Sequence, residues 1–459
     1  MTIGYDKFDL DLLGQQPGLH LYTQLCFCFV NPTSISDGAI IDTLEGGLKR
    51  LSNHAFWIAG DIMNDGSDHD STGTYSISRT RRDLHLVVED HRKTPTYSMA
   101  ELRDRNFPAS DLQEQLYASR MTSPPSTGST AVFEVKANFI NGGLILTIVG
   151  HHQVMDMMGQ AFLIRLLSRA CADQTITEDE LQILNTARAN SIPLLEGHAL
   201  AEAERKLQST TPEHTANIDE PLKPLPELPV QQPSRECSWV FFNFTSSALT
   251  VLKSEAASTI TSGYISTDDT MTAVVWKYLS IARTGRIGSK AITKLGRAVD
   301  VRRYLERPKT YPGLMQYMSH HSRTISQIKE ESLGSIASEL RVAVDPKTAK
   351  LAEDVRLLAT KIAQTKDRSK FNFTGAFDPS TSLMLSSWAG VECYDLGFGL
   401  GLGLPEMVRR PSFTNVEGLG YFMPKCPNGD IALLLCARIE DLEQLKSDQA
   451  FIKYATYIG

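Results

Sequence analysis

The sequence predicts an α/β (α+β) protein made of mixed β-sheets covered by helices and divided into two domains. Its 459 residues exceed the length of one ordinary domain. Apolar stretches of strand length alternate with segments whose apolar residues recur at helical spacing. A stretch with six prolines and little periodicity, 212–233, is interpreted as a crossover linker. The predicted domains are therefore 1–211 and 234–459.

The composition limits the class of protein. Hydrophobic residues make up 42% of the chain, enough for sizeable cores, and the formal net charge is −7. Because there is no long basic run, we do not expect nucleic acid as the main partner. No apolar run reaches membrane-spanning length, and the N-terminal segment lacks a signal-peptide core. The seven scattered cysteines favour a reduced cytoplasmic protein with free thiols and no membrane attachment.

The elements of the first half follow from apolar patterning. Leu21–Val30 is an apolar run typical of a central strand, and Ile40 and Leu44 fall on one face of a helix. Thr177 stands ahead of three acidic residues, as a helix N-cap does. The acidic, glycine-containing segment 64–73 is expected to be a solvated loop. We predict strands at 21–30, 54–60, 75–78, 84–88, 131–140 and 144–149, and helices at 35–51, 98–103, 111–117, 156–171 and 177–189.

The second half repeats the alternation of strands and helices. The segment 266–269 (STDD) is a capping sequence ahead of apolar residues at helical spacing, among them Met271, Val274 and Val275. An apolar run at 431–439 is a strand. We predict strands at 238–244, 290–301, 382–388 and 431–439, and helices at 246–257, 270–283, 322–344, 351–367 and 439–457.

The most informative motif lies where the strand at 144–149 gives way to a helix. His152 and Asp156 form a His-x-x-x-Asp pattern, which is known from acyl transfer. An imidazole titrates nearest neutrality, so it suits removing a hydroxyl proton at pH 7. Asp156 either polarises the histidine or holds the loop through an arginine. A base at a strand end faces a cavity while its backbone is held rigidly.

A metal site is the alternative interpretation of this motif. His151, His152 and Asp156 are residue types that bind zinc. Adjacent residues at a strand end point to opposite faces, however, which disfavours a shared ion. We therefore predict no metal, and we expect His151 to face away from the site.

Three other motifs are weaker. The glycines of 397–403 lack the third glycine that a nucleotide loop needs, and more readily allow close backbone approach. The pair at 320–321 is read as two strand-end or loop histidines rather than as ligands. The arginine pairs at 302–303 and 409–410 are solvated or pair with anions, and either is able to meet a phosphate.

Taken together, these segments resemble the BAHD superfamily of CoA-dependent acyltransferases, and within it the fungal trichothecene 3-O-acetyltransferases. The match runs through most of the chain, and several blocks in the right order are far more specific than the histidine motif alone. The blocks that carry it are 77–90, 144–171, 269–283 (DTMTAVVWKYLSIAR), 297–302 (RAVDVR), 308–314, 379–388 (PSTSLMLSSW), 398–410, 421–424 (YFMP) and 453–455.

The resemblance implies two chloramphenicol-acetyltransferase-like domains with the active-site channel between them. His152 would be the catalytic base, and Asp156 would pair with Arg283 of the second domain. Ser386 and Trp388 would line the channel, with Ser386 or a backbone N–H donating to the developing oxyanion. The resemblance also assigns Ser266, Thr267 and Arg302 to CoA binding.

One departure from the family pattern concerns the glycine-rich loop. Gly397 stands where the family has an aspartate, which usually pairs with an arginine matching Arg302. Asp395, two residues earlier, is the expected substitute partner for Arg302. The departure affects how the loop is held and not the chemistry.

The resemblance implies an O-acetyltransferase with acetyl-CoA as co-substrate and no bound cofactor. The acceptor would be a secondary hydroxyl of an apolar polycyclic compound, namely the C3 hydroxyl of a trichothecene, and the enzyme would be a monomer. Two rivals stay open: another acyl donor or acceptor on the same fold, and a non-catalytic protein that binds an apolar toxin. The intact His152, Asp156 and Arg283 favour the enzyme.

Overall fold

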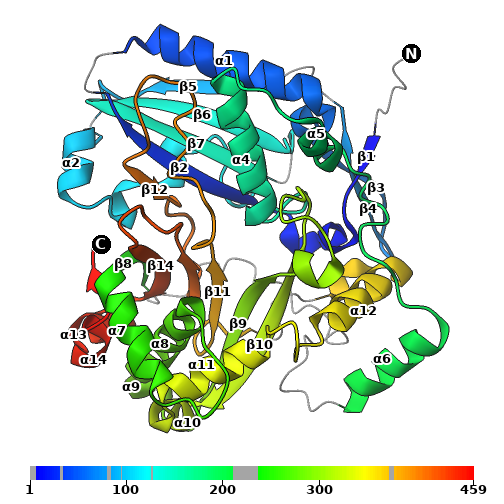
Figure 1. The fold of residues 1–459 in the computed structure, drawn as a ribbon, viewed down its shortest axis with the longest axis vertical. Coiled ribbons are helices and arrows are strands. Elements are labelled where there is room, and N and C mark those ends of the chain that lie inside the picture. Colours follow the sequence, from blue (N-terminus) through cyan, green and yellow to red (C-terminus); the bar gives the residue numbers. More distant parts are fainter. Residues whose placement is uncertain are drawn as a thin grey trace.

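A computed structural model of the chain describes residues 7–31, 35–79, 84–94, 96–125, 128–209, 236–371 and 377–459. Two larger sheets, one from each half of the chain, lie one above the other, each with its own layer of helices (Figure 1). The proposed linker 212–233 lies outside the described residues, so the limits of the two domains stay predictions. No helix in the described ranges is long and apolar enough to cross a bilayer.

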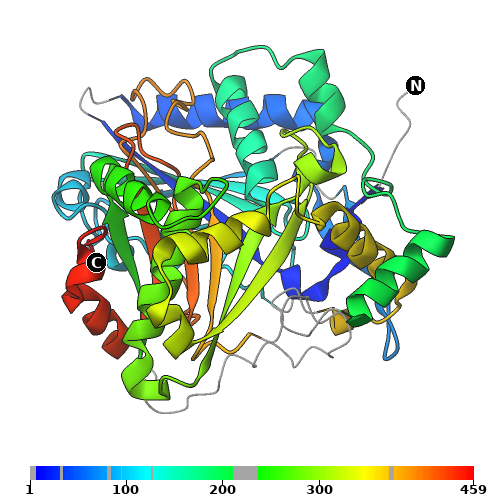
Figure 2. The same cartoon turned by 60° about the horizontal axis from the view of Figure 1, so that its bottom comes forward.

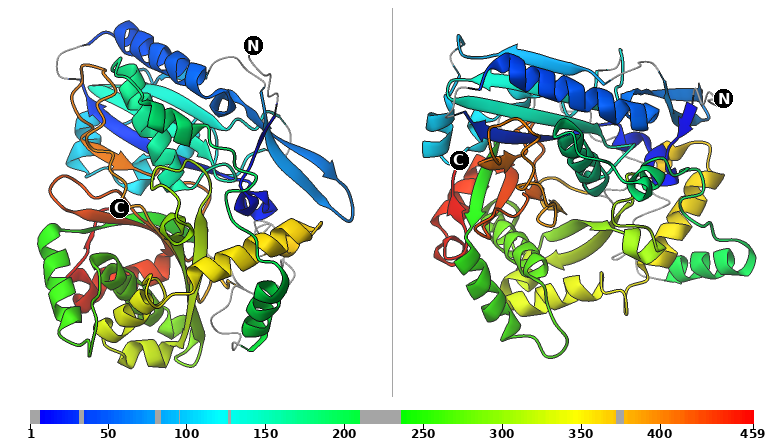
Figure 3. Two further views of the ribbon diagram at one scale, coloured as in Figure 1. Left: turned by 45° about the vertical axis from the view of Figure 1, so that its right-hand side comes forward. Right: turned by 45° about the horizontal axis from the view of Figure 1, so that its top comes forward.

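The sheet of the first half has five strands in the order β12-β2-β7-β6-β5. It is mixed, because β5 and β6 pair in parallel and the other neighbours are antiparallel. Two helices, α1 and α4, cover one face (Figure 3). The bounds are β2 Tyr22–Val30, β5 Leu86–Asp90, β6 Phe133–Ile140, β7 Gly143–His151, β12 Met407–Arg409, α1 Asp37–His54 and α4 Met157–Cys171.

The sheet of the second half has seven strands in the order β10-β9-β11-β13-β14-β8-β15. It is also mixed, because β11 pairs in parallel with both of its neighbours. Helices pack on it as a layer (Figure 2). The bounds are β8 Cys237–Phe244, β9 Ile292–Asp300, β10 Gln316–Thr324, β11 Leu383–Ser387, β13 Leu419–Phe422, β14 Ile431–Arg438, β15 Thr456–Tyr457, α7 Ser246–Ala257, α8 Thr267–Ala282, α10 Ile325–Glu330, α11 Leu333–Val342 and α13 Ile439–Ser447.

The two halves are joined by a segment that crosses between them. β12 belongs to the second half by sequence, yet it pairs antiparallel with β2 at the edge of the first sheet. The segment that carries it extends up to the first sheet in the ribbon (Figure 1). Sequence patterning did not predict this strand, because three residues are too few to show a period.

Several predicted elements differ from the structure. The predicted strand at 54–60 is instead a 3₁₀ turn, η3 (Phe56–Ala59), in which Trp57 and Ile58 are buried. The predicted loop at 64–73 is a hairpin of β3 (Asp61–Ser67) and β4 (Thr72–Ser78). Backbone hydrogen bonds between the two strands hold that hairpin. Its side chains are mostly polar, so the sequence shows no apolar strand pattern there. The predicted helix at 322–344 begins as the end of β10, and the one at 439–457 stops early and ends in β15.

The remaining elements connect or flank the two sheets. A short strand, β1, joins β3 and β4 in a three-stranded sheet. Their bounds are β1 Lys7–Asp9, η1 Leu12–Gln15, η2 Pro17–Leu19, α2 Met99–Asp104, η4 Ala109–Asp111, α3 Glu114–Tyr117, α5 Glu178–Leu184, α6 Gly197–Ser209, α9 Thr284–Ile287, η5 Arg302–Leu305, α12 Leu351–Gln364, η6 Arg368–Lys370 and α14 Gln449–Ile452.

Candidate active site

The His152 side chain lies in the short loop between β7 and α4, and it is held in one tautomer. Its backbone N–H donates to the carbonyl of Leu21 at 2.7 Å, which ties the loop to the start of β2. Its Nδ1 lies 3.1 Å from the carbonyl oxygen of Met155. Because a carbonyl only accepts, we assign the ring proton to Nδ1. The lone pair is then on Nε2, as a general base requires.

The environment of His152 keeps the ring neutral. Burial lowers the pKa of His152 below its ordinary value of 6.5, against the opposing effects of the Met155 carbonyl and Asp156. The base form is the deprotonated one, so a lowered pKa extends it to lower pH. We expect kcat/KM to be flat from neutral pH down past 6.5 and then to fall with a slope of one proton. A pH–rate profile measures this limb, and an inflection above 6.5 would contradict the assignment.

The buried His151 ring packs against the rings of Tyr22 and His20. Its side chain is fully buried, with its ring centroid 4.8 Å from those of Tyr22 and His20. Its Nδ1 accepts from the backbone N–H of Gln153 at 3.3 Å. Burial holds the pKa of His151 well below its usual value, so the ring is neutral. Among the described residues no cluster of three or more His, Cys, Asp or Glu side chains is placed to hold a metal ion.

The Asp156 carboxylate fixes the loop to the second half of the chain. It caps α4 by accepting from the N–H of Gly159 at 2.9 Å. It accepts from both terminal nitrogens of Arg302, at 2.9 and 2.8 Å, and from the backbone N–H of Met315 at 2.8 Å. The predicted partner, Arg283, is therefore wrong, and Arg302 takes that place. Of the two roles considered for Asp156, the structure supports the one in which it holds the loop.

Arg302 is buried and fully engaged, so its assignment to CoA binding is wrong too. The side chain is 1% exposed. Besides Asp156, its N–H groups donate to Asp300 and to the carbonyls of Tyr311 and Gly313, at 2.8–3.0 Å. All five N–H groups of the guanidinium are thus used, and none is left for a phosphate.

Arg283 lies elsewhere, at the C-terminal end of α8. It donates to the carbonyls of Ser382 and Pro379, at 2.8 and 3.3 Å, and its Nε lies 3.4 Å from the Asp441 carboxylate. It stabilises the interior of the second sheet's helical layer. The sequence spacing did not reveal this, because an arginine after a long apolar helix has the same appearance whichever carboxylate it meets.

Side-chain hydrogen bonds of Arg188 and Gln153 also hold the catalytic loop in place. Arg188 donates to the carbonyl of Val154 at 2.7 Å and stacks over Trp57 at 4.4 Å from the ring centroid. The side-chain amide of Gln153 donates to the carbonyls of Gly14 and Gln16 at 3.1 and 3.3 Å. These supports had no sequence signal, since each joins segments far apart in the chain.

Ser386 and Trp388 lie together at the end of β11. The indole Nε1–H of Trp388 donates to the hydroxyl oxygen of Ser386 at 3.2 Å. This leaves the Ser386 hydrogen to donate elsewhere. Ser387, between them, turns to the other face of the strand, where its hydroxyl donates to Asp268 at 2.5 Å.

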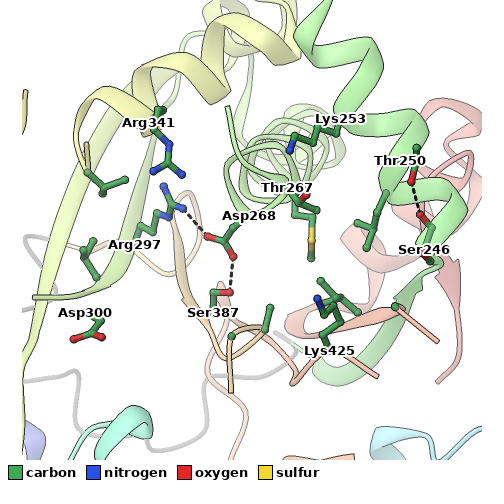
Figure 4. Close-up of a pocket in the computed structure, with 18 of the residues that line it drawn as sticks. Ser246, Thr250, Lys253, Thr267, Asp268, Arg297, Asp300, Arg341, Ser387 and Lys425 are labelled. Atoms are coloured by element: carbon green, nitrogen blue, oxygen red, sulfur yellow. Dashed lines mark hydrogen bonds and ion pairs between the residues drawn. The ribbon is translucent and has the colours of Figure 1, made fainter. Parts of the chain in front are cut away.

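A cavity of about 1020 Å³ opens on that other face. It is lined by the start of α8, by α7, and by the ends of β9 and β11 (Figure 4). Asp300 forms part of its wall and accepts a hydrogen bond from Arg302, the residue that also binds Asp156 of the catalytic loop. The basic residues of the lining are Lys253, Arg297, Arg303, Arg341 and Lys425.

The two residues at the start of α8 differ in their availability. Thr267 lines the cavity, so its assignment to CoA binding stays a proposal. Ser266 does not line it: its hydroxyl caps α8 with Asp269 and accepts from Arg341 at 2.7 Å. We therefore correct the role of Ser266 to helix capping.

The glycine-rich loop at 397–403 packs on α4. Phe398 donates its N–H to the Ser168 hydroxyl at 3.1 Å, and its ring meets Phe27 edge-on at 5.4 Å. Gly399 has a φ of +63°, and a Cβ there would lie 2.9 Å from the Cα of Ala172. The loop therefore needs glycine for its close approach.

Asp395 does not replace the missing aspartate. Its carboxylate binds Arg165 of α4 at 2.9 Å, and Arg302 is committed to Asp156. The prediction of an Asp395–Arg302 pair is wrong. An exposed pair such as Asp395–Arg165 contributes at most about 1 kcal/mol.

Three of the four arginines in the pairs 302–303 and 409–410 are buried and not solvated. Arg302, Arg409 and Arg410 are each at most 2% exposed, and only Arg303 is exposed. Sequence alone did not separate them, since an arginine after a strand is buried only if distant segments cover it.

The fold and this loop define a class of protein: a two-domain acyltransferase with a His-x-x-x-Asp loop between strand and helix. A family model for the trichothecene 3-O-acetyltransferase-like N-terminal domain matches residues 21–171. An O-acetyltransferase from Cryptosporiopsis sp. is 41% identical, over 98% of this chain and 97% of that one. The trichothecene 3-O-acetyltransferase of Saccharomyces cerevisiae is 39% identical, over 98% of this chain and 95% of that one.

A solved structure gives the same answer. The F. graminearum enzyme in complex with coenzyme A and deoxynivalenol superimposes with a TM-score of 0.90 and 39% identity, covering 99% of this chain and all of that one. The chain therefore belongs to the trichothecene 3-O-acetyltransferase-like family of BAHD-type, CoA-dependent O-acyltransferases. The predicted fold class, of two mixed-sheet domains covered by helices, is confirmed.

Proposed function

We propose that this protein transfers acetyl from acetyl-CoA to a secondary hydroxyl of an apolar polycyclic acceptor, the C3 hydroxyl of a trichothecene. The observation that carries the proposal is the His152 ring, whose Nδ1 is bound to the Met155 carbonyl, so that Nε2 is the basic atom. The relatives named as trichothecene 3-O-acetyltransferases, and the one that binds deoxynivalenol, support the acceptor class.

The reaction needs only this base and a donor for the oxyanion. Nε2 of His152 takes the hydroxyl proton as the acceptor oxygen bonds to the thioester carbonyl carbon. The carbonyl oxygen becomes an oxyanion, and the Ser386 hydroxyl, oriented by Trp388, donates to it. When the C–S bond breaks, His152 returns the proton to the thiolate of CoA. No acetyl-enzyme forms, because both substrates meet at one base.

Acetyl-CoA would occupy the cavity beside β11 and α8. Its volume suits a large cosubstrate, and its rim carries Lys253 and Lys425, whose charges oppose phosphate groups. In Figure 4 both lysines lie among the residues that line the space next to Thr267. Arg297 and Arg341 also line it, but they pair with acidic residues of α8, Asp268 and Asp269.

Replacing these two lysines is expected to weaken the binding of acetyl-CoA without changing the chemical step. We predict that Lys253→Met together with Lys425→Met raises KM for acetyl-CoA about tenfold and leaves kcat within a factor of two, since each exposed pair contributes about 0.2–1 kcal/mol. Steady-state kinetics at low and high salt measure this, because added salt screens the loss. Lys329→Met, on α10 outside the cavity lining, is the matched control. An unchanged KM in the double variant would place CoA elsewhere.

Acetyl-CoA turnover with and without a trichothecene tests the proposed function. We expect CoA release and a 3-O-acetyl product only when the trichothecene is present. Turnover with another alcohol or acyl-CoA, and none with the trichothecene, would favour the first rival on the same fold. Binding of the toxin without turnover would favour the non-catalytic rival.

The setting of the enzyme is also part of the proposal. All seven cysteines have free thiols, which supports a reducing compartment, and we propose the cytoplasm. We propose that the protein acts as a monomer, because one chain supplies the base, the oxyanion donor and the cavity. Domain limits of 1–211 and 234–459 accompany this proposal.

A further inference from the structure

Residues 311–315 (YPGLM) form a segment of the second half that carboxylates of the first half bind at two points. Its last backbone N–H donates to Asp156 of the catalytic loop at 2.8 Å. The backbone N–H of Leu314 donates to the carboxylate of Asp11 at 3.0 Å, and the hydroxyl of Tyr311 donates to the same carboxylate at 2.5 Å. The Asp11 side chain is fully buried and directly precedes η1. One short segment therefore joins Asp11 to the catalytic loop.

Glycines allow the close approach on which these contacts depend. A Cβ added to Gly313 would lie 2.0 Å from Oδ2 of Asp11. A Cβ added to Gly159, in the first turn of α4, would lie 2.4 Å from the carbonyl oxygen of Pro312. A side chain at either position would push the segment 311–315 away from the first half, so both positions need glycine.

Asp11 also has a cationic partner, and this partner reaches the catalytic loop. Nη1 of Arg188 lies 3.8 Å from the Asp11 carboxylate, and the same nitrogen donates to the carbonyl of Val154 at 2.7 Å. Both charged side chains are fully buried, so the loss of either charge would leave the other uncompensated. Asp11 is thus joined to the loop in two ways, through Arg188 at Val154 and through 311–315 at Asp156.

The peptide group held between these two contacts orients the base. The carbonyl of Met155, which accepts from Nδ1 of His152 at 3.1 Å, lies between Val154 and Asp156 in the chain. Because the direction of the ring follows this carbonyl, a displaced carbonyl turns Nε2 away from the hydroxyl that it must deprotonate. Transfer depends steeply on such placement, since a shift of about 1 Å can cost about 10²-fold in rate.

We propose that Asp11 is a positioning residue of the acetyl transfer: a buried carboxylate that fixes the Met155 carbonyl and, through it, the His152 ring. This rests on the proposed function, in which His152 is the base. Asp11 acts through Arg188 on one side of Met155 and through 311–315 on the other. The cavity assigned to acetyl-CoA is lined by other residues. Loss of Asp11 is therefore expected to slow the chemical step and to leave the binding of acetyl-CoA as it is.

Steady-state kinetics of Asp11→Asn, beside Asp441→Asn as a matched control, test this role. Asp11→Asn keeps the size of the side chain but removes the charge that faces Arg188. We expect kcat to fall by about ten- to hundredfold with an unchanged KM for acetyl-CoA. Asp441 is equally buried and binds Arg283 and Arg286 in the second half. Asp441→Asn is therefore expected to lower the melting temperature and leave kcat unchanged, when both variants are assayed well below their melting temperatures.

A second pair of variants tests the same contact from the other side. Tyr311→Phe removes only the hydroxyl that donates to Asp11, and Gly313→Ala places a methyl group against Oδ2. Both are expected to lower kcat without raising KM for acetyl-CoA, and they replace Asp11→Asn if that variant does not fold. A wild-type kcat in Asp11→Asn, or in both replacements, overturns the proposal. An equal loss of kcat in Asp441→Asn also overturns it, because the effect would then follow any buried carboxylate.

Failure here is distinguishable from failure of the proposed function. If His152→Ala abolishes transfer while Asp11→Asn and Tyr311→Phe keep the wild-type kcat, only the role of Asp11 is lost. If His152→Ala keeps full activity, the base assignment itself is wrong, and the role of Asp11 falls with it.

Discussion

Substituting His152 by alanine is expected to lower kcat by about 10²–10⁴-fold, the contribution of a positioned general base. The ring offers Nε2 as the basic atom because Nδ1 is bound to the Met155 carbonyl. The backbone contact to Leu21 does not involve the side chain, so the loop should persist. Steady-state kinetics beside a thermal melt measure both effects.

His151→Ala is the matched control for this substitution. Its ring packs against Tyr22 and His20 in the buried interior, so its removal is expected to cost stability more than turnover. If His151→Ala lost as much kcat as His152→Ala, with an unchanged melting temperature, the assignment of His152 rather than His151 as the base would be contradicted. Wild-type kcat in His152→Ala would end the proposed mechanism.

Breaking the Asp156–Arg302 pair is expected to destabilise the protein by about 3–5 kcal/mol, the cost of leaving one buried charge unpaired. Both side chains are at most 5% exposed, and the contact is bidentate. Unfolding in denaturant of Asp156→Asn, Arg302→Met and the double variant measures the coupling. We expect the double variant to lose much less than the sum of the singles.

Arg283 supplies the control for this cycle. It is equally buried but pairs with Asp441, so its loss is expected to add to that of Asp156→Asn without coupling. Coupling between Asp156 and Arg283, or additive losses for Asp156 and Arg302, would contradict the geometry described here.

The sequence predicted the elements on which the base depends, because their patterns are local. The apolar run before His152 and the helical spacing after Asp156 are the end of β7 and the start of α4. Thr177 is the N-cap of α5, in a capping box with Glu180. Such patterns involve only a few neighbouring residues, so they can be recognised in a single sequence.

Partners distant in sequence could not be predicted in the same way. Asp156 and Arg302 are 146 positions apart, and several buried arginines were available to a carboxylate on the catalytic loop. Which arginine it meets depends on how the two sheets stack. The packing of Arg410 against the rings of Trp388, Phe413 and Tyr421 could not be predicted for the same reason, because these rings come from β13 and two loops.

The central claim is that His152 activates the acceptor for direct attack, with no acetylated protein on the way. A rapid-quench single turnover with acetyl-CoA and a trichothecene, followed by intact-protein mass spectrometry, tests it most directly. We predict that the 3-O-acetyl product appears in one phase while the protein mass stays unchanged, and that no acetyl is retained when the acceptor is omitted. An acetylated protein that forms and decays at the rate of product formation would contradict the account.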